Sequence, residues 1–345
     1  MKRILCCLIA LFCLTACMPA DKPDENGDHT PLVLWGDTVY TKGMFRYTLA
    51  TIKTRYISEY YEQLGKIDSF LDVPALWEKE YDAHNTLGEE ILSLAITSAK
   101  TMICFAHLAD EKELVLTKKQ QASVRESVKQ IQDHFESEEA LHDYLSTFGM
   151  DKASLEAYYS LQIKSEAAQE YYFNANTGIQ KVSEKEAMAY FKENFATLKH
   201  IFLNYEKGWE EKRDEIKAGL DEGKDIESFA TYSQDGFFDS FADGMLVYEG
   251  STGFKTYEKA ALKLKVGKSV VLEDTDGVYI MCRYANKEDA FASPLSQEST
   301  LTIRDLIVTL LTNEKIRKTV EDQKNLVLDA SQIKGITTIN SPLIH

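Results

Sequence analysis

The sequence predicts an α+β protein in which a mostly helical part, made of the N- and C-terminal segments, carries an inserted small α+β unit. Helical patterns of apolar residues dominate residues 33–180. Strand patterns then alternate with short helical ones over 181–290, which is typical of a compact α+β unit. Residues 291–345 return to helix, so we expect the helices on both sides of the insert to pack as one discontinuous domain.

Residues 1–16 have the layout of a secretory signal peptide, with a basic start, an apolar run and small residues at the end. The apolar run at 4–16 is too short to cross a hydrocarbon core of about 30 Å as a helix. Because Leu-Thr-Ala at 14–16 is followed by Cys17, the segment resembles a bacterial lipoprotein signal. That resemblance implies that Cys17 carries the lipid and that the mature chain is extracytoplasmic, anchored to the bacterial cell membrane. An ordinary cleaved signal peptide is the alternative.

Residues 17–32 are polar and rich in Pro, Gly and Asp, which predicts a flexible tether. A short strand at 32–35, a turn at Gly36 and a helix capped by Thr41 follow. Thr117 and Gln120 have capping-box spacing, and Ser137 and Asp151 are expected to cap the next two helices. One stripe with helical spacing is expected to face the core: Ile91, Leu94, Ala95, Ser98, Met102 and Phe105.

The insert begins with a second capping box, at Ser183 and Glu186. We expect strands at 198–203, 270–272 and 278–284, and helices at 184–194, 208–221, 226–232 and 257–264. After the insert we expect a helix around Ile303 and Ile307 and two short strands, at 326–328 and 336–339.

The composition excludes some classes of function. The 345 residues carry a formal charge of −16, which becomes −18 when Lys2 and Arg3 leave with the signal. That charge disfavours nucleic-acid binding, which needs clustered Lys and Arg to neutralise phosphates. Outside the signal region only Cys104 and Cys282 remain, both among apolar residues, so structural thiols are expected rather than a disulfide framework.

The segment 196–284 resembles a parvulin-type peptidyl-prolyl isomerase domain. The matching residues, in order, are Lys199-His200-Ile201-Phe202-Leu203, Gly223-Lys224-Asp225, Phe229-Ala230, Tyr232-Ser233-Gln234-Asp235, Tyr257-Glu258-Lys259-Ala260-Ala261-Leu262, Val266-Gly267-Lys268-Ser269 and Gly277-Val278-Tyr279-Ile280. Each motif is degenerate, so the resemblance depends on their order across roughly 90 residues.

The flanking segments are similar to the helical part of SurA/PrsA-type extracytoplasmic foldases. The matching residues are Gly36-Asp37-Thr38-Val39-Tyr40-Thr41, Leu114-Val115-Leu116-Thr117 with the helix that follows, and Gly149-Met150-Asp151. Together with Cys17, the resemblance implies a PrsA-like foldase lipoprotein: a helical SurA/PrsA-type chaperone domain with an inserted parvulin-like domain.

The resemblance also implies a site. An X-Pro bond rotates slowly across a barrier of ~18–20 kcal/mol, and a site accelerates rotation by preferring the twisted amide. An apolar pocket with an oriented polar floor supplies this preference without a metal or organic cofactor. The resemblance places His200 and Asp235 in that floor, and Tyr279 stands where the family has a second histidine. The residues that it implies for the walls of the substrate pocket are Tyr257, Phe202 and Val247.

The predicted function is a membrane-anchored foldase that binds unfolded, newly exported polypeptides and isomerises their X-Pro bonds. Because Tyr279 replaces a histidine and the glycine-rich segment near Gly244 is reduced, a holdase chaperone with an inactive parvulin domain is the alternative. A second alternative is a solute-binding lipoprotein, which would have strands alternating with helices in two lobes. The sequence leaves open whether the chain forms a homodimer.

Overall fold

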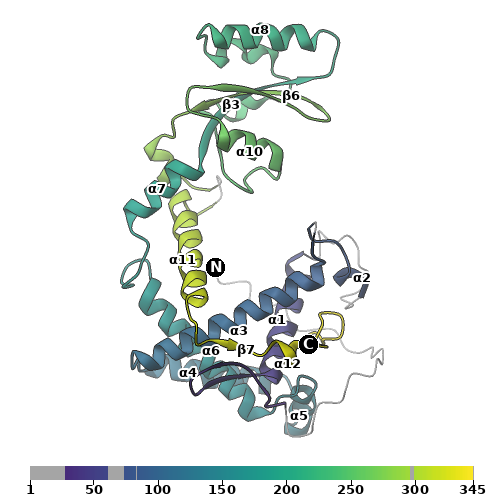
Figure 1. The fold of residues 1–345 in the computed structure, drawn as a ribbon, viewed down its shortest axis with the longest axis vertical. Coiled ribbons are helices and arrows are strands. Elements are labelled where there is room, and N and C mark those ends of the chain that lie inside the picture. The colour runs from purple at the N-terminus through teal and green to yellow at the C-terminus, as the bar shows by residue number, and fades with distance from the viewer. Residues whose placement is uncertain (1–27, 61–73, 83, 296–298, 345) are drawn as a thin grey trace. The chain divides into compact units, whose positions relative to one another are not determined.

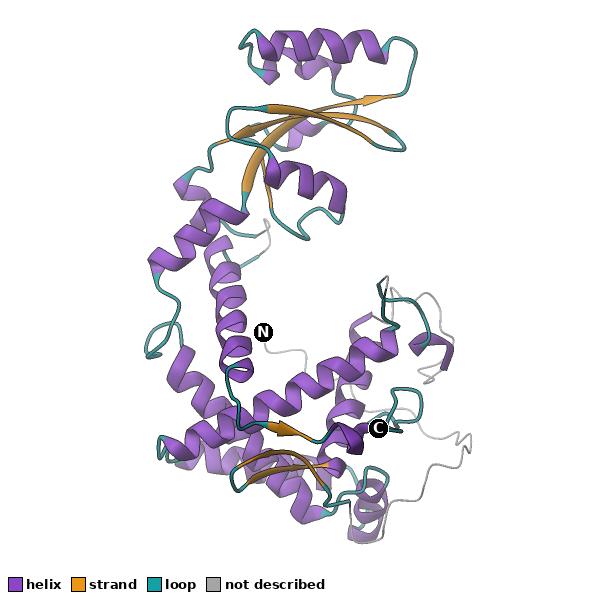
Figure 2. Cartoon of the chain, viewed as in Figure 1, coloured by secondary structure: helices purple, strands orange, loops and turns teal. Residues whose placement is uncertain are grey.

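The computed structural model describes residues 28–60, 74–82, 84–295 and 299–344. These residues form helices and two small antiparallel sheets, which confirms the predicted α+β class (Figure 2). They divide into two compact units: unit 1 holds the described residues up to Lys181 and those from Glu314 onward, and unit 2 is Val182–Asn313. The second division falls inside a helix, beyond the boundary at 290 that the sequence suggested. The predicted signal peptide and Cys17 lie outside the described residues.

Unit 1 combines a three-stranded sheet with packed helices (Figure 1). Its elements are β1 (Pro31–Trp35), β2 (Thr38–Thr41), α1 (Lys42–Tyr60), α2 (Pro74–Trp77), α3 (Leu87–Glu111), α4 (Lys118–Gln132), α5 (Glu138–Ser146), α6 (Lys152–Phe173), β7 (Val327–Leu328) and α12 (Ala330–Ile333), with α11 (Ile303–Glu321) shared with unit 2. The sheet order is β2-β1-β7, and both pairings are antiparallel. Gly36 forms the β1–β2 turn with φ of +56°, a conformation that glycine adopts without a steric cost.

The predicted start signals of the unit 1 helices are confirmed. The Thr117 side chain accepts the backbone N–H of Gln120, whose own side chain returns to the Thr117 backbone. Ser137 and Asp151 each accept a backbone N–H of the helix that they precede. These bonds satisfy N–H groups that have no partner inside the helix, so local chemistry alone sets where the helices begin.

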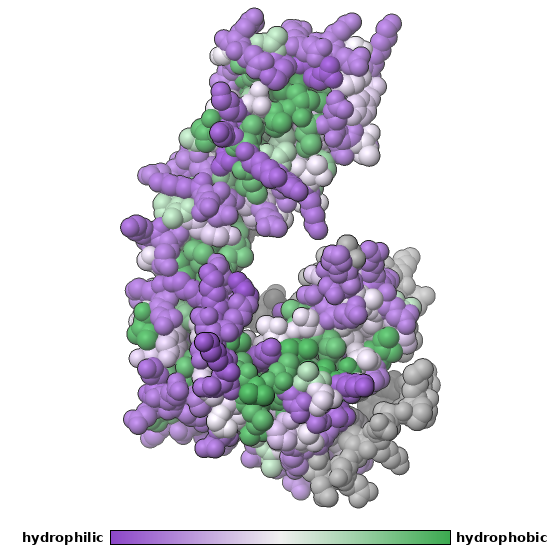
Figure 3. Space-filling model, viewed as in Figure 1, coloured by the Kyte–Doolittle hydropathy of each residue, from purple (hydrophilic) through white to green (hydrophobic). Residues whose placement is uncertain are grey.

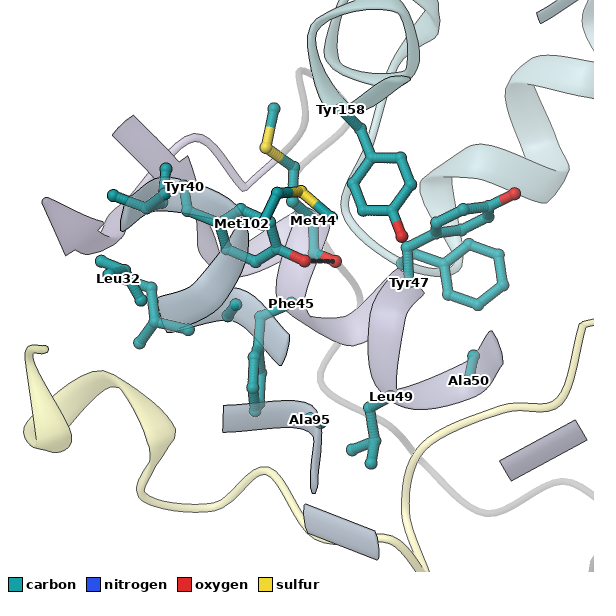
Figure 4. Packing of buried hydrophobic residues seen from close by; sticks show 14 of the residues in the cluster. Leu32, Tyr40, Met44, Phe45, Tyr47, Leu49, Ala50, Ala95, Met102 and Tyr158 are labelled. Carbon is teal, nitrogen blue, oxygen red and sulfur yellow. Dashed lines mark hydrogen bonds between the residues drawn. The ribbon is translucent and has the colours of Figure 1, made fainter. Parts of the chain in front are cut away.

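The core of unit 1 is rich in aromatic side chains, and Figure 4 shows part of it. Tyr40 and Phe45 are fully buried, and Leu32 of β1 is buried in the same cluster. The rings of Tyr47 and Tyr158 meet edge to face, with centroids 5.3 Å apart. Burial of this kind removes large apolar areas from water, so the aromatic residues of the helical part serve mainly as core.

Helix α3 crosses this core and packs against α6 and α1. Its buried line follows Ile91, Ala95 and Ala99, whereas Leu94, predicted on the buried stripe, is 45% exposed. Leu94 lies at the border of the apolar face, where no neighbouring element covers it among the described residues. By length and composition α3 resembles a membrane-spanning helix, but half of its most apolar stretch is buried inside the unit.

The chain enters the fold earlier than the sequence predicted. The backbone N–H of Asp28 donates to the carbonyl of Gly149 at 2.6 Å, and Arg46 donates to the Asp28 carboxylate at 3.1 Å. The first strand then begins at Pro31. The tether assigned to 17–32 is therefore corrected at its end, because residues 28–32 are bonded to unit 1; residues 17–27 lie outside the described part of the chain.

The C-terminal segment contains one wrong prediction. The strand at 326–328 is confirmed as β7, which pairs with β1, but residues 336–339 form no strand. Backbone carbonyl groups of this segment accept hydrogen bonds from a side chain instead. The fully buried Lys53 donates to the carbonyl of Thr338 at 2.6 Å and to that of Ser341. The Thr338 hydroxyl donates to the carbonyl of Gly88. Because these buried carbonyl groups already have donors, the segment does not need to pair with a strand.

Unit 2 is a four-stranded antiparallel sheet with helices on both faces (Figure 1). Its elements are α7 (Glu184–Asn194), β3 (Ala196–Asn204), α8 (Trp209–Asp221), η1 (Ile226–Tyr232), α9 (Phe237–Ser240), β4 (Met245–Val247), α10 (Lys255–Lys263), β5 (Ser269–Glu273), β6 (Gly277–Tyr284) and η2 (Glu288–Ala292), followed by the start of α11. The sheet order is β4-β3-β6-β5. The predicted strands and the capping box at Ser183 are confirmed, while the expected helix at 226–232 is a 3₁₀ helix.

The two faces of this sheet have separate cores. Ile201 and Ile280 face the side covered by α8 and η1. Leu198 and Met281 face the opposite side, which α10 covers through Ala261. Successive residues of a strand point to opposite faces, so His200 and Phe202 lie on the α10 side with Leu198.

Candidate functional site

The candidate site begins with the register of the two central strands. In the antiparallel β3–β6 pair, His200 lies opposite Met281 and Phe202 lies opposite Tyr279. The alternation of each strand puts all four side chains on the face that α10 covers. The sheet therefore brings His200 and Tyr279 together although they are far apart in sequence, with ring centroids 5.3 Å apart.

His200 is 6% exposed, and both of its ring nitrogens have partners. Nδ1 lies 2.7 Å from the hydroxyl of Tyr257, on the first turn of α10. Nε2 lies 2.6 Å from Oδ2 of Asp235, in the loop after η1. The ring of the buried Phe237 lies 4.0 Å from the His200 ring, centroid to centroid. The imidazole is thus held in one orientation from three sides.

Asp235 accepts hydrogen bonds on both carboxylate oxygens. Its Oδ1 accepts the Ser233 hydroxyl at 2.9 Å and the backbone N–H of Phe237 at 3.1 Å. Burial tends to raise the pKa of this carboxyl group, but the bonds from His200, Phe237 and Ser233 outweigh it, so the pKa lies below its ordinary value. Asp235 is therefore ionised at neutral pH.

The proton positions follow from these partners. An ionised Asp235 only accepts, so Nε2 of His200 carries the hydrogen of that bond. Burial, with contributions from Tyr279 and Asp235, raises the pKa of Tyr257 well above its ordinary value, so its hydroxyl keeps its proton. In the neutral imidazole Nδ1 has no hydrogen and accepts the Tyr257 hydroxyl. The chain from Tyr257 through His200 to Asp235 therefore leaves no donor of His200 unpaired.

The Asp235 loop is hydrogen-bonded to the part of β3 beyond Leu198, where β4 no longer pairs with that strand. The backbone N–H of Phe202 donates to the Ser233 hydroxyl at 3.0 Å, and the N–H of Gln234 donates to the carbonyl of Phe202 at 3.0 Å. The N–H of Asn204 donates to the Gln234 side chain at 2.7 Å. These bonds fix Asp235 beside His200, because they anchor the two residues immediately before it.

Tyr279 lies at the centre of an aromatic cluster. Its ring centroid lies 4.7 Å from that of Phe202, 5.4 Å from that of Tyr257 and 6.0 Å from that of Phe254. Tyr279 and Phe202 are half-buried, and within the described residues the Tyr279 hydroxyl has no hydrogen-bond partner. Burial, followed by the nearby carboxylates of Asp235, Asp274 and Asp276, raises the pKa of Tyr279, which keeps the hydroxyl protonated.

The structure thus brings together five of the residues assigned from the sequence: His200, Asp235, Tyr279, Tyr257 and Phe202. Val247 is placed differently. It lies on β4, pairs with Ala196 and is fully buried in the core under α10. Cys17 lies outside the described residues.

Three contributing residues received no role in the sequence analysis: Ser233, Phe237 and Phe254. Ser233 stands two residues before Asp235, and a hydroxyl at that spacing is a common loop anchor, so its role could have been suspected. No local signal marks Phe237 or Phe254, since their packing against His200 and Tyr279 depends on chain segments distant in sequence.

The arrangement offers hydrogen bonds and apolar rings rather than a metal site. Within the described ranges, no group of three or more His, Cys, Asp or Glu side chains is placed to hold a metal ion. Cys282, which lies next to Met281 on β6, is a poor nucleophile, because burial and the charge of Asp225 raise the pKa of its thiol to about 11. The site is suited to orienting a bound group, as rotation about an amide requires.

No protein-family model matches the chain, and no curated protein sequence matches it. Solved structures do. The chain is similar to PrsA from Bacillus subtilis at 19% identity, over 72% of this chain and 93% of that one, with a TM-score of 0.25. It is similar to the peptidylprolyl isomerase PrsA from Bacillus cereus at 18% identity, over 71% and 89%, with a TM-score of 0.35.

A third similar structure, the foldase protein PrsA from Lactococcus lactis, is 14% identical over 88% of this chain and 96% of that one, with a TM-score of 0.24. These three solved structures are PrsA structures, the family that the sequence resembles.

Proposed function

We propose that the chain is a PrsA-type foldase for exported proteins and that unit 2 catalyses cis–trans isomerisation of X-Pro bonds. The observation that carries the proposal is the hydrogen-bonded chain from the buried Tyr257 and His200 to the partly exposed Asp235. It lies against the half-buried ring of Tyr279, whose hydroxyl has no partner among the described residues. Rotation about an X-Pro bond makes and breaks no covalent bond, so such a site needs no nucleophile.

In the proposed mechanism the proline ring lies against the rings of Phe202, Tyr279 and Phe254. A planar imide has no free lone pair on nitrogen, whereas the twisted imide has one that accepts a hydrogen bond. The Tyr279 hydroxyl donates to that lone pair and therefore favours the twisted state over the planar one. Each ~1.4 kcal/mol of such preference accelerates rotation tenfold.

In this scheme His200 does not transfer a proton. Its two hydrogen bonds, to Tyr257 and Asp235, fix the imidazole, whose edge-to-face contact with Tyr279 then holds the phenol ring in place. A ring held in advance costs less to order when substrate binds, so the hydroxyl of Tyr279 is in position at the moment of rotation.

The test measures, by exchange NMR, how fast the full-length chain isomerises the single alanyl-prolyl bond of a tetrapeptide. We expect Y279F, which removes the proposed donor, to lower kcat/KM by about a hundredfold, on the scale of losing an oriented donor, and H200A and D235A, which remove groups that position Tyr279, each by about tenfold. H142A, at an exposed histidine of α5 in unit 1, is the matched control and should leave turnover unchanged. Folded H200A and D235A proteins with full turnover would refute the assignment.

We also propose that unit 1 binds unfolded segments of exported chains. Its exposed large apolar residues include Leu94 of α3, Val327 of β7 and Ile339, and Figure 3 shows apolar side chains on the face of unit 1 near α3. Exposed apolar area of this kind is typical of binding surfaces for apolar segments. L94D should weaken suppression of the aggregation of an unfolded client, while E113Q, at an exposed acid beyond α3, should not.

Attachment to the cell membrane through lipid on Cys17 belongs to the same proposal. It is supported by the sequence layout before that residue. Replacing Cys17 by serine should release the chain from the membrane fraction and abolish incorporation of a labelled fatty acid. A C17S chain that stays in that fraction would remove the lipid anchor from the proposal.

The alternative is a holdase with the same architecture. It is favoured by one observation, that a tyrosine stands at position 279 where the parvulin resemblance leads us to expect a histidine. In that case the wild-type chain suppresses aggregation and shows no turnover in the peptide assay. The solute-binding alternative expects alternating strands and helices in two lobes, whereas every strand pair in the described residues is antiparallel.

A further inference from the structure

Glu258 is a buried carboxylate that the proposed mechanism does not use. It is 4% exposed, follows Tyr257 in the first part of α10, and has no salt bridge to a cation among the described residues. A buried charge without a counter-ion is costly unless several donors surround it, so its partners show what it does.

Those partners all belong to the loop that leads from β4 to α10. The carboxylate accepts the backbone N–H of Gly250 at 2.9 Å, and the backbone N–H and the hydroxyl of Thr252 at 2.7 and 2.8 Å. These bonds lower the pKa of Glu258 although burial opposes the shift. The loop also contains Gly250 with φ of +82° and Gly253 with φ of +72°, a backbone conformation that residues other than glycine rarely adopt.

A second hydrogen bond links the loop held by Glu258 to the aromatic cluster around Tyr279. The hydroxyl of Thr252 that donates to Glu258 also accepts the backbone N–H of Phe254 at 3.1 Å. The Phe254 ring lies 6.0 Å from both Tyr257 and Tyr279. Phe254 is the residue before the first turn of α10 and has no side-chain cap, so Thr252 supplies the polar contact that holds it there.

We propose that Glu258 is a positioning residue for prolyl substrates: through Thr252 it holds the loop 248–254 so that Phe254 forms a wall of the aromatic cluster around Tyr279. This inference rests on the proposed isomerase function. Glu258 touches no reacting atom, so its loss should weaken substrate binding more than the rotation step itself.

The experiment compares E258Q with E249Q in the full-length chain. Glutamine keeps the size of the side chain, but its NH₂ group cannot accept the N–H donors of the loop. We expect E258Q to raise KM for the alanyl-prolyl tetrapeptide about tenfold with kcat changed less than twofold, by the loss of buried hydrogen bonds. Glu249 is an exposed acid of the same loop, so E249Q should leave both constants unchanged.

T252V is the second variant, in case E258Q does not fold. It keeps the carboxylate and the backbone bonds but removes the hydroxyl that links Glu258 to Phe254, so a smaller rise in KM is expected. An active wild type whose KM is unchanged in a folded E258Q or T252V protein overturns the positioning role alone. A wild type with no turnover refutes the isomerase function, and the positioning role with it.

Discussion

Each unit holds a hydrogen-bonded chain of side chains that includes a buried tyrosine, and the comparison separates a structural network from a candidate site. In unit 1 the hydroxyls of Tyr40, Thr48 and Tyr158 are bonded in sequence and almost fully buried. In unit 2 the Tyr257 hydroxyl is instead hydrogen-bonded to His200, which is hydrogen-bonded to the ionised Asp235. The unit 1 chain carries no charge at neutral pH, because the ordinary pKa of tyrosine is about 10 and burial raises the pKa of Tyr40 and of Tyr158 further.

The two networks also differ in their exposure to solvent. The Asp235 side chain is 27% exposed, and Tyr279 beside it is half-buried with a hydroxyl that has no partner among the described residues. The unit 1 network lies entirely among buried groups, including the Met44 carbonyl that accepts the Tyr40 hydroxyl, whereas the unit 2 network ends at the partly exposed Asp235. Buried tyrosines alone therefore say little about function; a charged end and a free donor at an exposed edge distinguish the site.

The largest effect should come from breaking the core around the unit 1 network. Phe45 is fully buried, so F45A should lower the free energy of unfolding by about 3–5 kcal/mol through the cavity that it leaves. Chemical denaturation of the full-length chain measures this loss. Prolyl turnover at low denaturant should be unchanged, because the site lies within unit 2; a parallel loss of turnover would show that the two networks are coupled.

The sharpest comparison uses the same substitution in both networks. Y257F removes the hydroxyl that donates to His200 and should lower kcat/KM about tenfold, because it leaves a buried imidazole nitrogen without a donor. Y158F should cost about 1 kcal/mol of stability and leave turnover intact. Equal effects of the two variants on turnover would contradict the distinction drawn between the networks.

A smaller effect is expected from the anchor of Asp235. S233A removes a donor to that carboxylate, so the pKa of Asp235 should rise and the acid limb of the pH–rate profile should move to higher pH. Turnover at neutral pH should fall about threefold, and S233T should restore it. S228A is the control, since the exposed Ser228 donates its hydroxyl to the carbonyl of Asp225, the residue before this 3₁₀ helix, and has no hydrogen bond to Asp235 or His200 among the described residues.

The smallest effect concerns acid stability. The folded-state pKa of Asp235 lies below its ordinary value of about 3.9, so its stabilising contribution is present above that value and is lost as the pH falls through the folded-state pKa. D235N should therefore flatten the loss of unit 2 stability on acidification. The tyrosine network of unit 1 does not titrate there, and Y158F should leave the slope unchanged. Urea denaturation between pH 5 and pH 2, within the range where acid unfolding is expected, measures both slopes.

Local chemistry made several elements predictable. Capping boxes such as Ser183 with Glu186 act over three residues, and strand alternation places His200 and Phe202 on one face whatever lies around them. Contacts between distant segments were not predictable in the same way. Leu94 has helical spacing but is exposed, because burial depends on which neighbour covers that side of α3.

For this protein the sequence by itself determined the α+β class, most helix starts and the central strands, because caps and periodicity act within a few residues. It also pointed to His200 and Asp235 through a resemblance. Only the tertiary structure decided that Tyr257 closes the hydrogen-bonded chain, that Val247 lies in the core and that Glu258 anchors the Phe254 loop. The physical reason is that the burial of a side chain and its hydrogen-bond partners depend on segments that are distant in the sequence and become neighbours only in the fold. No local sequence pattern specifies them.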